Sequence, residues 1–250
     1  MKSKILKKIC GVLGYKLIEK NVAKNQRYLP EFSSLNIKKV LNKLILKNKI
    51  NYIIQVGAND GESFDELNYF IKEYKIKSLL IEPIKDNFEK LKKTYKNTNH
   101  VILENSALSI NDEILFLYKV NPNYINNYGS HIPAIPSFYK KHLLNHGVKE
   151  KHIIKEKINP ISFKKLLDKH KIQDFDLLFL DAEGYDGKIV DSFFDDSTIR
   201  PIIIFEFIHI DPAFFKTLIK KIKDKKYLLF PIEENIICFP KEKEITIDLN

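Results

Sequence analysis

The stretch Asn51-Tyr-Ile-Ile-Gln-Val-Gly-Ala-Asn-Asp-Gly-Glu-Ser-Phe64 carries the pattern from which the fold can be predicted. Residues 52–56 are mostly apolar and predict a short buried strand, and apolar residues at helical spacing predict a helix over residues 62–74. Gly57 and Gly61 lie between the two. This order of strand, glycine turn and helix is typical of nucleotide- and phosphate-binding units. Glycines let the backbone approach a ligand, and a helix N-terminus presents N–H donors.

The spacing of the two glycines narrows the class of ligand. Gly57 and Gly61 form a Gly-x-x-x-Gly turn. This is neither the Gly-x-Gly-x-x-Gly of dinucleotide folds nor a phosphate loop that ends in Gly-Lys-Ser/Thr. A turn with so few glycines suits a nucleoside ligand that has no pyrophosphate. Taken alone, the turn is equally consistent with a helix cap that binds nothing.

Strands and helices alternate along the remainder of the chain. Further strands are predicted over residues 76–82, 100–105, 113–120 (as one arm of a hairpin), 175–181, 202–208, 227–231 and 236–240. Helices are predicted over residues 37–46, 85–95, 137–146, 161–170 and 211–225, one more is predicted to start at Tyr185, and a long loop is predicted over residues 121–137. This alternation predicts an α/β fold with a mostly parallel, doubly wound sheet and an antiparallel C-terminal strand.

Polar or glycine residues stand at the carboxyl ends of five predicted strands. They are the turn from Gly57 to Gly61, Glu82, the run from Asn105 to Ala107, the run from Asp181 to Gly184, and the run from Glu206 to His209. Ligands of open parallel sheets bind beyond this edge, near the point where the strand order reverses. Five coincident strand ends are more specific than any single motif, so the sequence predicts one binding site at this edge.

The positive charge is confined to the start of the chain. The 250 residues carry a formal net charge of +10, but residues 1–50 hold thirteen Lys and Arg residues against two acids, Glu19 and Glu31. The rest of the chain is close to neutral, so the basic cleft of a nucleic-acid enzyme is not indicated and no nucleic-acid partner is expected. We divide the chain into a basic N-terminal helical arm, residues 1–49, and one domain, residues 50–250.

The first twenty residues leave two interpretations open. Ile5, Leu6 and Ile9 lie at helical spacing among lysines. Such a helix can lie on the anionic inner face of a membrane, or it can pack on the domain with its lysines in water. No run approaches the roughly 18 apolar residues of a membrane span. The two cysteines, Cys10 and Cys238, have neither metal-binding nor disulfide spacing, which favours a reducing, cytoplasmic compartment.

Two of the strand ends have the chemistry of a nucleoside site. Glu82 lies about 20 residues beyond the glycine turn, where a carboxylate can accept hydrogen bonds from both hydroxyls of a ribose. Ser106 and Ala107 offer small side chains on which a flat base can rest. The alternative for Glu82 is a solvated glutamate at the end of a strand.

Five segments within residues 50–240 carry the most specific pattern in the chain. They are Ile54-Gln-Val-Gly-Ala-Asn-Asp-Gly61, Leu80-Ile-Glu-Pro83, Asn105-Ser-Ala-Leu108, Leu178-Phe-Leu-Asp-Ala-Glu-Gly184 and Pro201-Ile-Ile-Ile-Phe-Glu206. Together they resemble the FkbM family of methyltransferases. The resemblance implies a class I methyltransferase (Rossmann-like) fold, S-adenosylmethionine as the methyl donor, and hydroxyls of sugars, polyketides or surface glycans as acceptors. The cofactor-binding residues that it implies are Gln55, Gly57, Asn59, Asp60, Gly61, Glu82, Pro83, Ser106, Ala107 and Asp181.

One position departs from the pattern of the family. The first strand of the family usually carries an acid two residues before the first glycine, where this chain has Gln55. The carbonyl of the amide can still hold the ammonium group of the cofactor. Because the amide has no charge, the contact is expected to be weaker.

Methyl transfer to an alcohol requires that the acceptor oxygen is positioned and that its proton is removed. Asp181, His131 and His209 are the candidate catalytic residues, with Glu183 as a further candidate base. Asp181 is favoured because it ends a buried strand at the cofactor edge. Asp181, Glu206 and His209 are also candidate ligands for Mg or Mn, which would lower the pKa of a bound hydroxyl. The alternative is that Glu206 and His209 bind the substrate or orient its neighbours.

The leading function is an S-adenosylmethionine-dependent O-methyltransferase that acts on a sugar or a cell-surface glycan precursor. A chain rich in Lys, Ile and Asn and without Trp is typical of AT-rich bacterial genomes. Given the glycan acceptors that the resemblance implies, capsule or lipopolysaccharide biosynthesis is the expected setting. Two alternatives remain. One is a non-catalytic, methyltransferase-like binding module that is recruited by its basic arm. The other is a nicotinamide-dependent oxidoreductase, against which the missing dinucleotide motif counts.

Overall fold

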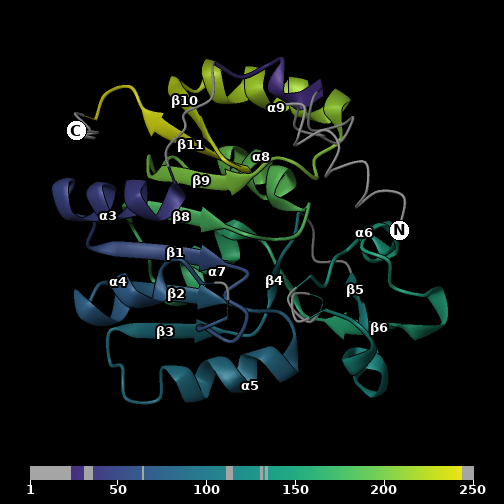
Figure 1. Cartoon of the computed structure of the whole chain (residues 1–250). Coiled ribbons are helices and arrows are strands. Elements are labelled where there is room, and N and C mark those ends of the chain that lie inside the picture. The colour runs from purple at the N-terminus through teal and green to yellow at the C-terminus, as the bar shows by residue number, and fades with distance from the viewer. Residues whose placement is uncertain are drawn as a thin grey trace.

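The computed structural model describes residues 24–30, 36–63, 65–110, 115–129, 132 and 135–243 (Figure 1). Three predictions lie outside the described residues: the basic helix over residues 1–20, the setting of Cys10 and the catalytic role of His131.

A seven-stranded sheet forms the centre of the described part of the chain. Its order is β10-β11-β9-β8-β1-β2-β3, and β11 alone runs antiparallel to its neighbours. The strands are β1 (Tyr52–Val56), β2 (Lys77–Ile81), β3 (Val101–Glu104), β8 (Leu177–Leu180), β9 (Ile202–Glu206), β10 (Tyr227–Ile232) and β11 (Asn235–Pro240). The order reverses between β1 and β8, which confirms the predicted doubly wound sheet with an antiparallel C-terminal strand.

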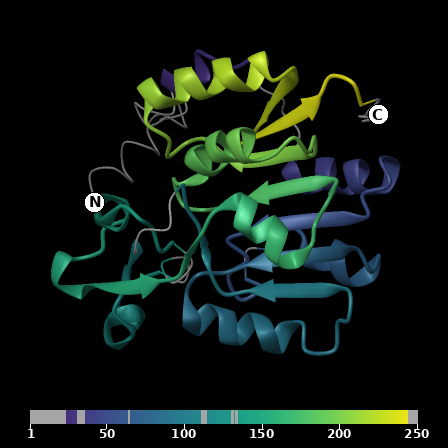
Figure 2. The ribbon, with the colours of Figure 1, turned by 180° about the vertical axis from the view of Figure 1, so that it is seen from behind.

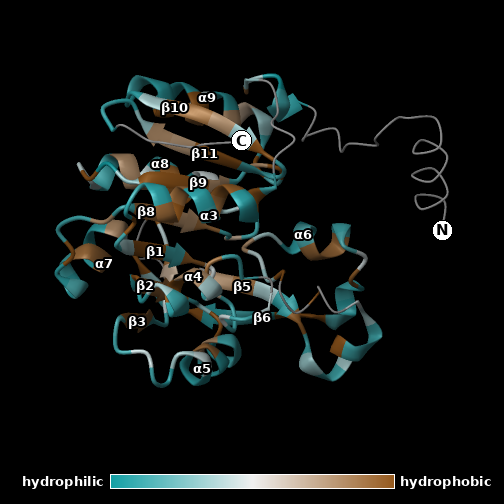
Figure 3. Ribbon diagram, turned by 60° about the vertical axis from the view of Figure 1, so that its left-hand side comes forward, coloured by the Kyte–Doolittle hydropathy of each residue, from teal (hydrophilic) through white to brown (hydrophobic). Residues whose placement is uncertain are grey.

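Helices cover both faces of the sheet. They are α3 (Ile37–Lys47), α4 (Asn68–Glu73), α5 (Lys85–Thr94), α7 (Phe163–His170), α8 (Asp186–Asp196) and α9 (Pro212–Asp224). Ile54 and Val56 of β1 pack with α7, α8 and α9, on the face of the sheet that is turned toward the viewer in Figure 2. Ile53 packs with α3, α4 and α5 on the other face. The sheet is apolar and the outer helix faces are largely polar (Figure 3). Alternate side chains of one strand thus fill two hydrophobic cores, as expected for a parallel sheet that is covered on both faces.

The end of the predicted arm packs on the domain. The buried face of α3 belongs to the same hydrophobic core as Ile53. Asn25 is fully buried, and its side-chain amide donates hydrogen bonds to the carbonyls of Phe207 (3.1 Å) and Ile210 (2.9 Å). The division of the chain after residue 49 stays a prediction, although α3 contributes to the core of the domain.

A further layer lies beyond the carboxyl ends of β1, β2 and β8, and we name it the cap (Figure 1). It consists of the described residues between 115 and 158. Its elements are β5 (Leu115–Val120), η1 (Pro122–Asn127), α6 (Lys140–Asn145), η3 (Glu150–His152) and β6 (Ile153–Ile158). The short strands β4 (Ala107–Leu108) and β7 (Pro160–Ile161) pair in parallel where the chain leaves and re-enters the domain.

The strand predicted over residues 113–120 is present as β5, but it is not one arm of a local hairpin. It pairs antiparallel with β6, which begins more than thirty residues later and which the sequence pattern did not predict. Lys155, Glu156 and Lys157 interrupt the apolar residues of β6, so the alternation that marks a half-buried strand is missing there. The cap is therefore held together by a non-local pairing that local patterns do not reveal.

The helix after the glycine turn begins later than the pattern predicts. It is α4, which starts at Asn68, whereas the described residues between 61 and 67 form turns and bends. The carboxylates of Asp60 and Asp65 each accept hydrogen bonds from backbone N–H groups two and three residues further on. Such bonds compete with helical hydrogen bonds, which explains the delay. The glycine turn is thus followed by a loop and not by a helix N-terminus.

Within the described residues, no helix combines the length and the apolar character that a membrane crossing requires.

Candidate active site

Two cavities meet at the carboxyl edge of the sheet. The apolar cavity has a volume of about 610 Å³ and the acidic cavity about 710 Å³, open mouths included. Both border Gly57, Asn59, Asp181 and Glu183, so they join at the ends of β1 and β8. The walls of the apolar cavity include Glu82, Pro83, Ile84, Ser106, Ala107, Leu108, Leu117, Pro136, Phe138 and Ile189. Those of the acidic cavity include Gln55, Ser63, Asp65, Glu66, Ile135 and Glu206.

The two glycines of the turn permit close packing. Gly57 has a φ of +82°, and a Cβ atom there would lie 1.9 Å from the carbonyl oxygen of Asp181. Gly61 has a φ of +74°, and a Cβ atom there would meet side-chain atoms of Leu91 (2.7 Å) and Tyr95 (2.8 Å). Only glycine adopts these backbone conformations without strain. Gly57 thus allows the ends of β1 and β8 to lie close together. Gly61 allows the turn to pack against α5 and the residue that follows it.

The predicted cofactor residues of the turn divide into two groups. Gly57 and Asn59 border both cavities. Asp60 and Gly61 border neither of the two cavities in the described part of the chain. The carboxylate of Asp60 instead closes its own turn, where it accepts hydrogen bonds from the N–H group of Ser63 (2.7 Å) and from its hydroxyl (2.8 Å). Its role is to shape the turn.

Glu82 follows β2 and lines the apolar cavity. Its Oε2 accepts a hydrogen bond from the N–H group of Asn59 (2.9 Å), and its Oε1 accepts one from that of Ile84 (2.8 Å). Desolvation of the buried carboxyl raises its pKa to about 7, although the two N–H donors act in the opposite direction. Each oxygen keeps a second lone pair. The carboxylate can therefore hold the glycine turn and still accept the hydroxyls of a ribose.

The wall of the apolar cavity beside Glu82 is suited to a flat ring. Pro83, Ser106 and Ala107 all lie in it, and Phe138 of the cap contributes to the same lining. The hydroxyl of Ser106 is buried and has no hydrogen-bond partner among the described residues. Buried polar groups are almost always paired, so an orphan hydroxyl in a cavity wall marks a place where a ligand can supply the partner.

A buried amide and a carboxyl lie next to each other in the acidic cavity. Nε2 of Gln55 donates a hydrogen bond to Oδ1 of Asp65 (3.2 Å). Oε1 of Gln55 and Oδ2 of Asp65 are buried and lack hydrogen-bond partners in the described part of the chain. Position 55 is the place where related sequences are expected to carry an acid. Asp65 therefore brings a carboxylate to the amide that replaces this acid.

The loop after β8 holds a strained residue against both cavities. Glu183 has a φ of +49°, in the left-handed region that non-glycine residues adopt only at a cost. Asp186, in the first turn of α8, is fully buried, and its carboxylate accepts hydrogen bonds from the N–H groups of Ala182 (3.1 Å) and Gly184 (3.2 Å). Desolvation raises the pKa of Asp186 to about 6. These bonds fix the backbone that carries Glu183.

Five carboxyl groups surround the acidic cavity, and burial raises the pKa of each of them. Desolvation, together with repulsion from Asp186 and Glu234, raises the pKa of Glu183 to about 8. The pKa values of Asp181 and Glu206 are raised well above their ordinary range, first by desolvation and then by neighbouring acids. None of the described lining residues is Lys or Arg. A cavity of this kind favours a ligand that carries positive charge.

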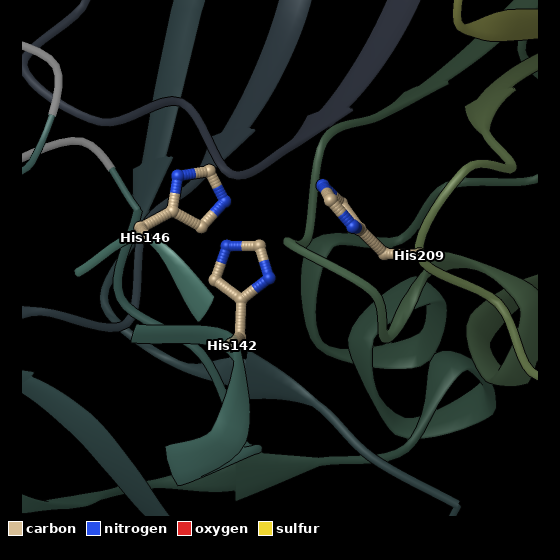
Figure 4. Close-up of side chains that lie close together, drawn as sticks. All are labelled: His142, His146 and His209. Atoms are coloured by element: carbon tan, nitrogen blue, oxygen red, sulfur yellow. The ribbon is translucent and has the colours of Figure 1, made fainter. Parts of the chain in front are cut away.

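Three histidines gather beside the acidic cavity (Figure 4). His142 lies in α6 of the cap and His146 follows that helix, whereas His209 lies between β9 and α9. Nε2 of His142 is 3.0 Å from Oε2 of Glu183, and Nε2 of His209 is 3.7 Å from Oε2 of Glu206. Burial and the two neighbouring histidines lower the pKa of His209 to about 4, so its imidazole is neutral at pH 7.

The predicted catalytic and metal-binding residues are brought together in part. Asp181 and Glu206 line one cavity, and His209 stands beside Glu206. Oxygen and nitrogen atoms of Glu183, Glu206 and His209 lie within 4.8 Å of one another, a group that does not include Asp181. The catalytic role of Asp181 and the metal site stay predictions.

Sequence reasoning missed several residues of the site. His142 and His146 are four residues apart in and after a predicted helix, a spacing that places them on one face, and this signal was available. Asp65 follows the glycine turn, but its contact with Gln55 depends on the loop that delays α4. Phe138 was not missed in this way: it stands next to the predicted loop over residues 121–137, which was expected to cover the acceptor, and it lines the apolar cavity.

The order of the strands, the antiparallel β11 and a nucleoside-type cavity at the reversal of the strand order define a class I, Rossmann-like methyltransferase fold. The sequence model of the methyltransferase FkbM domain matches residues 55–229. The chain belongs to this family and is an S-adenosylmethionine-dependent methyltransferase. This confirms the resemblance on which the cofactor was expected.

Several solved structures are similar to the chain at low sequence identity. Methyltransferase FkbM from Methylobacillus flagellatus KT is 11% identical with a TM-score of 0.45, over 94% of this chain and 70% of that one. The O-methyltransferase from Bacillus cereus in complex with SAH is 10% identical with a TM-score of 0.44, over 94% and 96%. The O-methyltransferase TomG from Streptomyces achromogenes is 8% identical with a TM-score of 0.44, over 96% and 99%. A search among curated proteins gave no match. The family assignment rests on the family model.

Proposed function

We propose that this methyltransferase transfers the methyl group of S-adenosylmethionine to a hydroxyl of a sugar or of a cell-surface glycan precursor. The observation that carries the proposal is the junction of the two cavities at Gly57, Asn59, Asp181 and Glu183. A nucleoside-type cavity there continues into a cavity rich in carboxyl groups. Carboxylates accept hydrogen bonds from hydroxyls, so the acidic cavity suits an acceptor with several hydroxyl groups.

The residues present fit the cofactor. Glu82 has lone pairs for the ribose hydroxyls, and the orphan hydroxyl of Ser106 can bond the base against the apolar wall. The unpartnered oxygens of Gln55 and Asp65 can receive the ammonium group. Asp65 thereby supplies the negative charge that Gln55 lacks. When bound, the cofactor supplies an electrophilic methyl group on a sulfonium.

We assign Asp181 the role of general base. Without a ligand its carboxyl holds a proton to a higher pH than usual, because it is desolvated and surrounded by acids. Positive charge in the neighbouring cavity lowers its pKa, so the carboxylate forms when the donor site is filled. It then accepts a hydrogen bond from the acceptor hydroxyl and takes the proton as the oxygen attacks. The neutral His209 is the second candidate base, and His131 stays a third.

Calorimetric titration of the purified protein with S-adenosylmethionine and S-adenosylhomocysteine tests the donor, with NAD as the control. Micromolar binding of the first two and none of NAD is expected. If neither S-adenosylmethionine nor S-adenosylhomocysteine gives binding heat, the donor site is contradicted. Because positive charge should ionise the buried acids, binding at pH 7 should release protons, which appears as a dependence of the heat on the ionisation enthalpy of the buffer.

The role of Asp181 is tested with the variant Asp181→Asn in an assay that follows release of S-adenosylhomocysteine over a panel of nucleotide sugars. Loss of the base should lower turnover by about 10²- to 10⁴-fold while donor binding persists. The exposed Asp168 offers the matched control, Asp168→Asn, which should keep full turnover. Near-normal turnover of Asp181→Asn would remove the assignment.

We also propose that residues 1–20 contact the anionic inner face of a membrane. Thirteen of the 42 Lys and Arg residues lie within residues 1–50, which supports the proposal. The protein should sediment with vesicles that contain phosphatidylglycerol and not with vesicles of phosphatidylcholine alone. A chain without residues 1–20 should lose sedimentation and keep turnover on a soluble acceptor. Equal sedimentation of both chains would rule the contact out.

A further inference from the structure

The three histidines beside the acidic cavity come from two separate layers of the molecule. His142 and His146 belong to the cap, and His209 belongs to the loop between β9 and α9 (Figure 4). One ring nitrogen of each lies within 4.8 Å of the other two. The ring centroid of His142 is 4.6 Å from that of His146 and 4.6 Å from that of His209. The three rings therefore lie close together.

Two carboxylates lie beside these rings. Oε2 of Glu183 is 3.0 Å from Nε2 of His142, and Oε2 of Glu206 is 3.7 Å from Nε2 of His209. Glu183, Glu206 and His209 themselves form a second group of ligand atoms within 4.8 Å. Oε2 of Glu206 is buried and has no hydrogen-bond partner among the described residues. The neighbourhood thus offers two groups of ligand atoms, one of three imidazoles and one with two carboxylates, which share His209.

We propose that His142, His146 and His209 form a site for a divalent transition-metal ion such as Zn²⁺ or Co²⁺, with Glu183 and Glu206 as the adjacent carboxylates. Imidazole nitrogen is the donor that these ions favour, whereas Mg²⁺ prefers oxygen. This donor set differs from the expected Mg or Mn site of Asp181, Glu206 and His209, with which it shares one histidine. Three histidines and an open position form the arrangement of exchangeable and catalytic zinc sites.

The distances between the imidazole nitrogens can be compared with those of a filled site. Nitrogen–metal bonds of about 2.0–2.1 Å place the nitrogens of a tetrahedral site about 3.3 Å apart. In this structure the nitrogens lie within 4.8 Å of one another, so the rings must move closer to hold an ion. His142 is 7% exposed and His209 is 24% exposed, whereas His146 lies on the surface. An ion can therefore enter from solvent past His146.

An ion at this place would connect the cap to the core of the domain. It would hold α6 against the loop that carries His209, next to two carboxyl groups of the acidic cavity. The open coordination position could then hold an acceptor oxygen, a role that rests on the proposed function. Metal binding itself does not depend on that function.

The experiment is a titration of protein that carries no polyhistidine tag and has been stripped with a chelator. Co²⁺ should give visible d–d absorption that saturates at one ion per chain, and Zn²⁺ should displace it. The variant His209→Ala should bind Zn²⁺ about 100-fold more weakly or worse, since even outer-shell changes cost 10–100-fold. The control is His100→Gln at the opposite edge of the sheet, where the imidazole lies 3.0 Å from the carbonyl oxygen of Ile71; this variant should bind the metal as the wild type does.

Two outcomes would overturn the proposal. Absence of saturable Co²⁺ absorption in the wild-type protein would do so. So would unchanged affinity in His209→Ala, because binding would then come from the pair His142 and His146 on one helix face alone. Titration with S-adenosylhomocysteine separates this proposal from the proposed function, since His209→Ala should retain donor binding. A protein that binds the metal but not S-adenosylhomocysteine would support the metal site and contradict the donor site.

Discussion

Ser137 Oγ donates a hydrogen bond of 2.8 Å to the carbonyl oxygen of Glu183. The same hydroxyl oxygen accepts a hydrogen bond from the N–H group of Tyr139 (3.2 Å), so it stands at the start of α6. Ser137 is fully buried, and Glu183 has a left-handed backbone. One hydroxyl therefore couples the cap to the strained loop that both cavities share.

The variant Ser137→Ala should lower the free energy of unfolding by about 1–3 kcal/mol, because it removes a buried hydrogen bond and leaves its partner unpaired. It should also weaken binding of S-adenosylhomocysteine, since the loop at Glu183 borders both cavities. Urea denaturation and calorimetry measure the two effects. The control is Ser192→Ala, whose hydroxyl contacts Asp196 on the surface (3.3 Å) and whose loss should cost less than about 0.5 kcal/mol. Equal stability of the two variants would contradict the coupling.

The variant Gly57→Ala should be strongly destabilised and should lose donor binding. Its Cβ atom would stand 1.9 Å from a backbone oxygen of Asp181, which cannot yield without separating β1 from β8. Gly147 provides a matched control, because it has the same φ of +82° and an added Cβ atom there meets nothing within 4 Å. Gly147→Ala should cost about 1–2 kcal/mol, the left-handed backbone alone. Thermal unfolding measures the stability of the two variants. Similar losses of stability would mean that the contact with Asp181 is unimportant.

The variant Asp65→Asn should weaken binding of S-adenosylhomocysteine by about 10-fold or more, the value of a charge-assisted hydrogen bond. The asparagine keeps an oxygen for the N–H groups of Leu67 and Asn68, so the loop before α4 should persist. Asp60→Asn is the control, because Asp60 closes its own turn and borders neither of the two cavities. Calorimetry at pH 7 gives both affinities. If both variants bind alike, Asp65 does not receive the ammonium group.

The ligand-free protein should lose stability as the pH rises from about 4.5 to about 8. The pKa of Glu183 is about 8 in the folded protein against an ordinary value of 4.5, chiefly because of desolvation. The folded state therefore binds more protons than the unfolded state between these values, and the free energy of unfolding falls with pH across this window. Below pH 4.5 both states hold the proton of Glu183, and the contribution of this group to the pH dependence ends.

The variant Glu183→Gln should flatten this decline, which thermal unfolding over a pH series detects. Glu150→Gln is the control: Glu150 is exposed, and Lys140 lowers its pKa, so its removal should leave the decline in place. Saturating S-adenosylmethionine should stabilise the wild type more at pH 8 than at pH 5, because its positive charge favours the ionised acids. An unchanged slope in Glu183→Gln would show that this carboxyl does not drive the decline.

The part of the site that lies on the sheet was predictable from the sequence. Buried apolar runs mark β1, β2, β8 and β9, and the residues that follow them must meet at one edge of a parallel sheet. Glu82, Asp181 and Glu206 were found in this way, before any contact was known. Gly57 was predicted too, as a place where the backbone approaches a ligand. It borders the cavities, but its missing side chain also makes room for the backbone of Asp181.

The part of the site that depends on the cap was predictable only in part. The spacing of His142 and His146 is visible in the sequence, but their place beside the site depends on the fold of the cap, whose strand β6 the apolar pattern does not predict. Asp65 was missed because its side chain and that of Asp60 delay the start of α4, a competition between side-chain and helical hydrogen bonds that apolar spacing does not register. Both cases concern contacts that form only after the chain has folded.

The place of β11 in the sheet has a consequence for the order of folding. Among the described residues, β11 is the last strand along the chain, yet it lies between β9 and β10, and β10 joins the sheet through it. During synthesis, β9 therefore keeps an unpaired edge until residues 235–240 emerge. The backbone N–H group of Phe207, beside the site, donates a hydrogen bond to the carbonyl of Glu234 (3.1 Å), so this bond also forms only after residue 234 has been made. The strand that carries Glu206 is thus paired on both sides only when β11 has been made, so a nascent chain acquires a finished site only after this strand has joined the sheet.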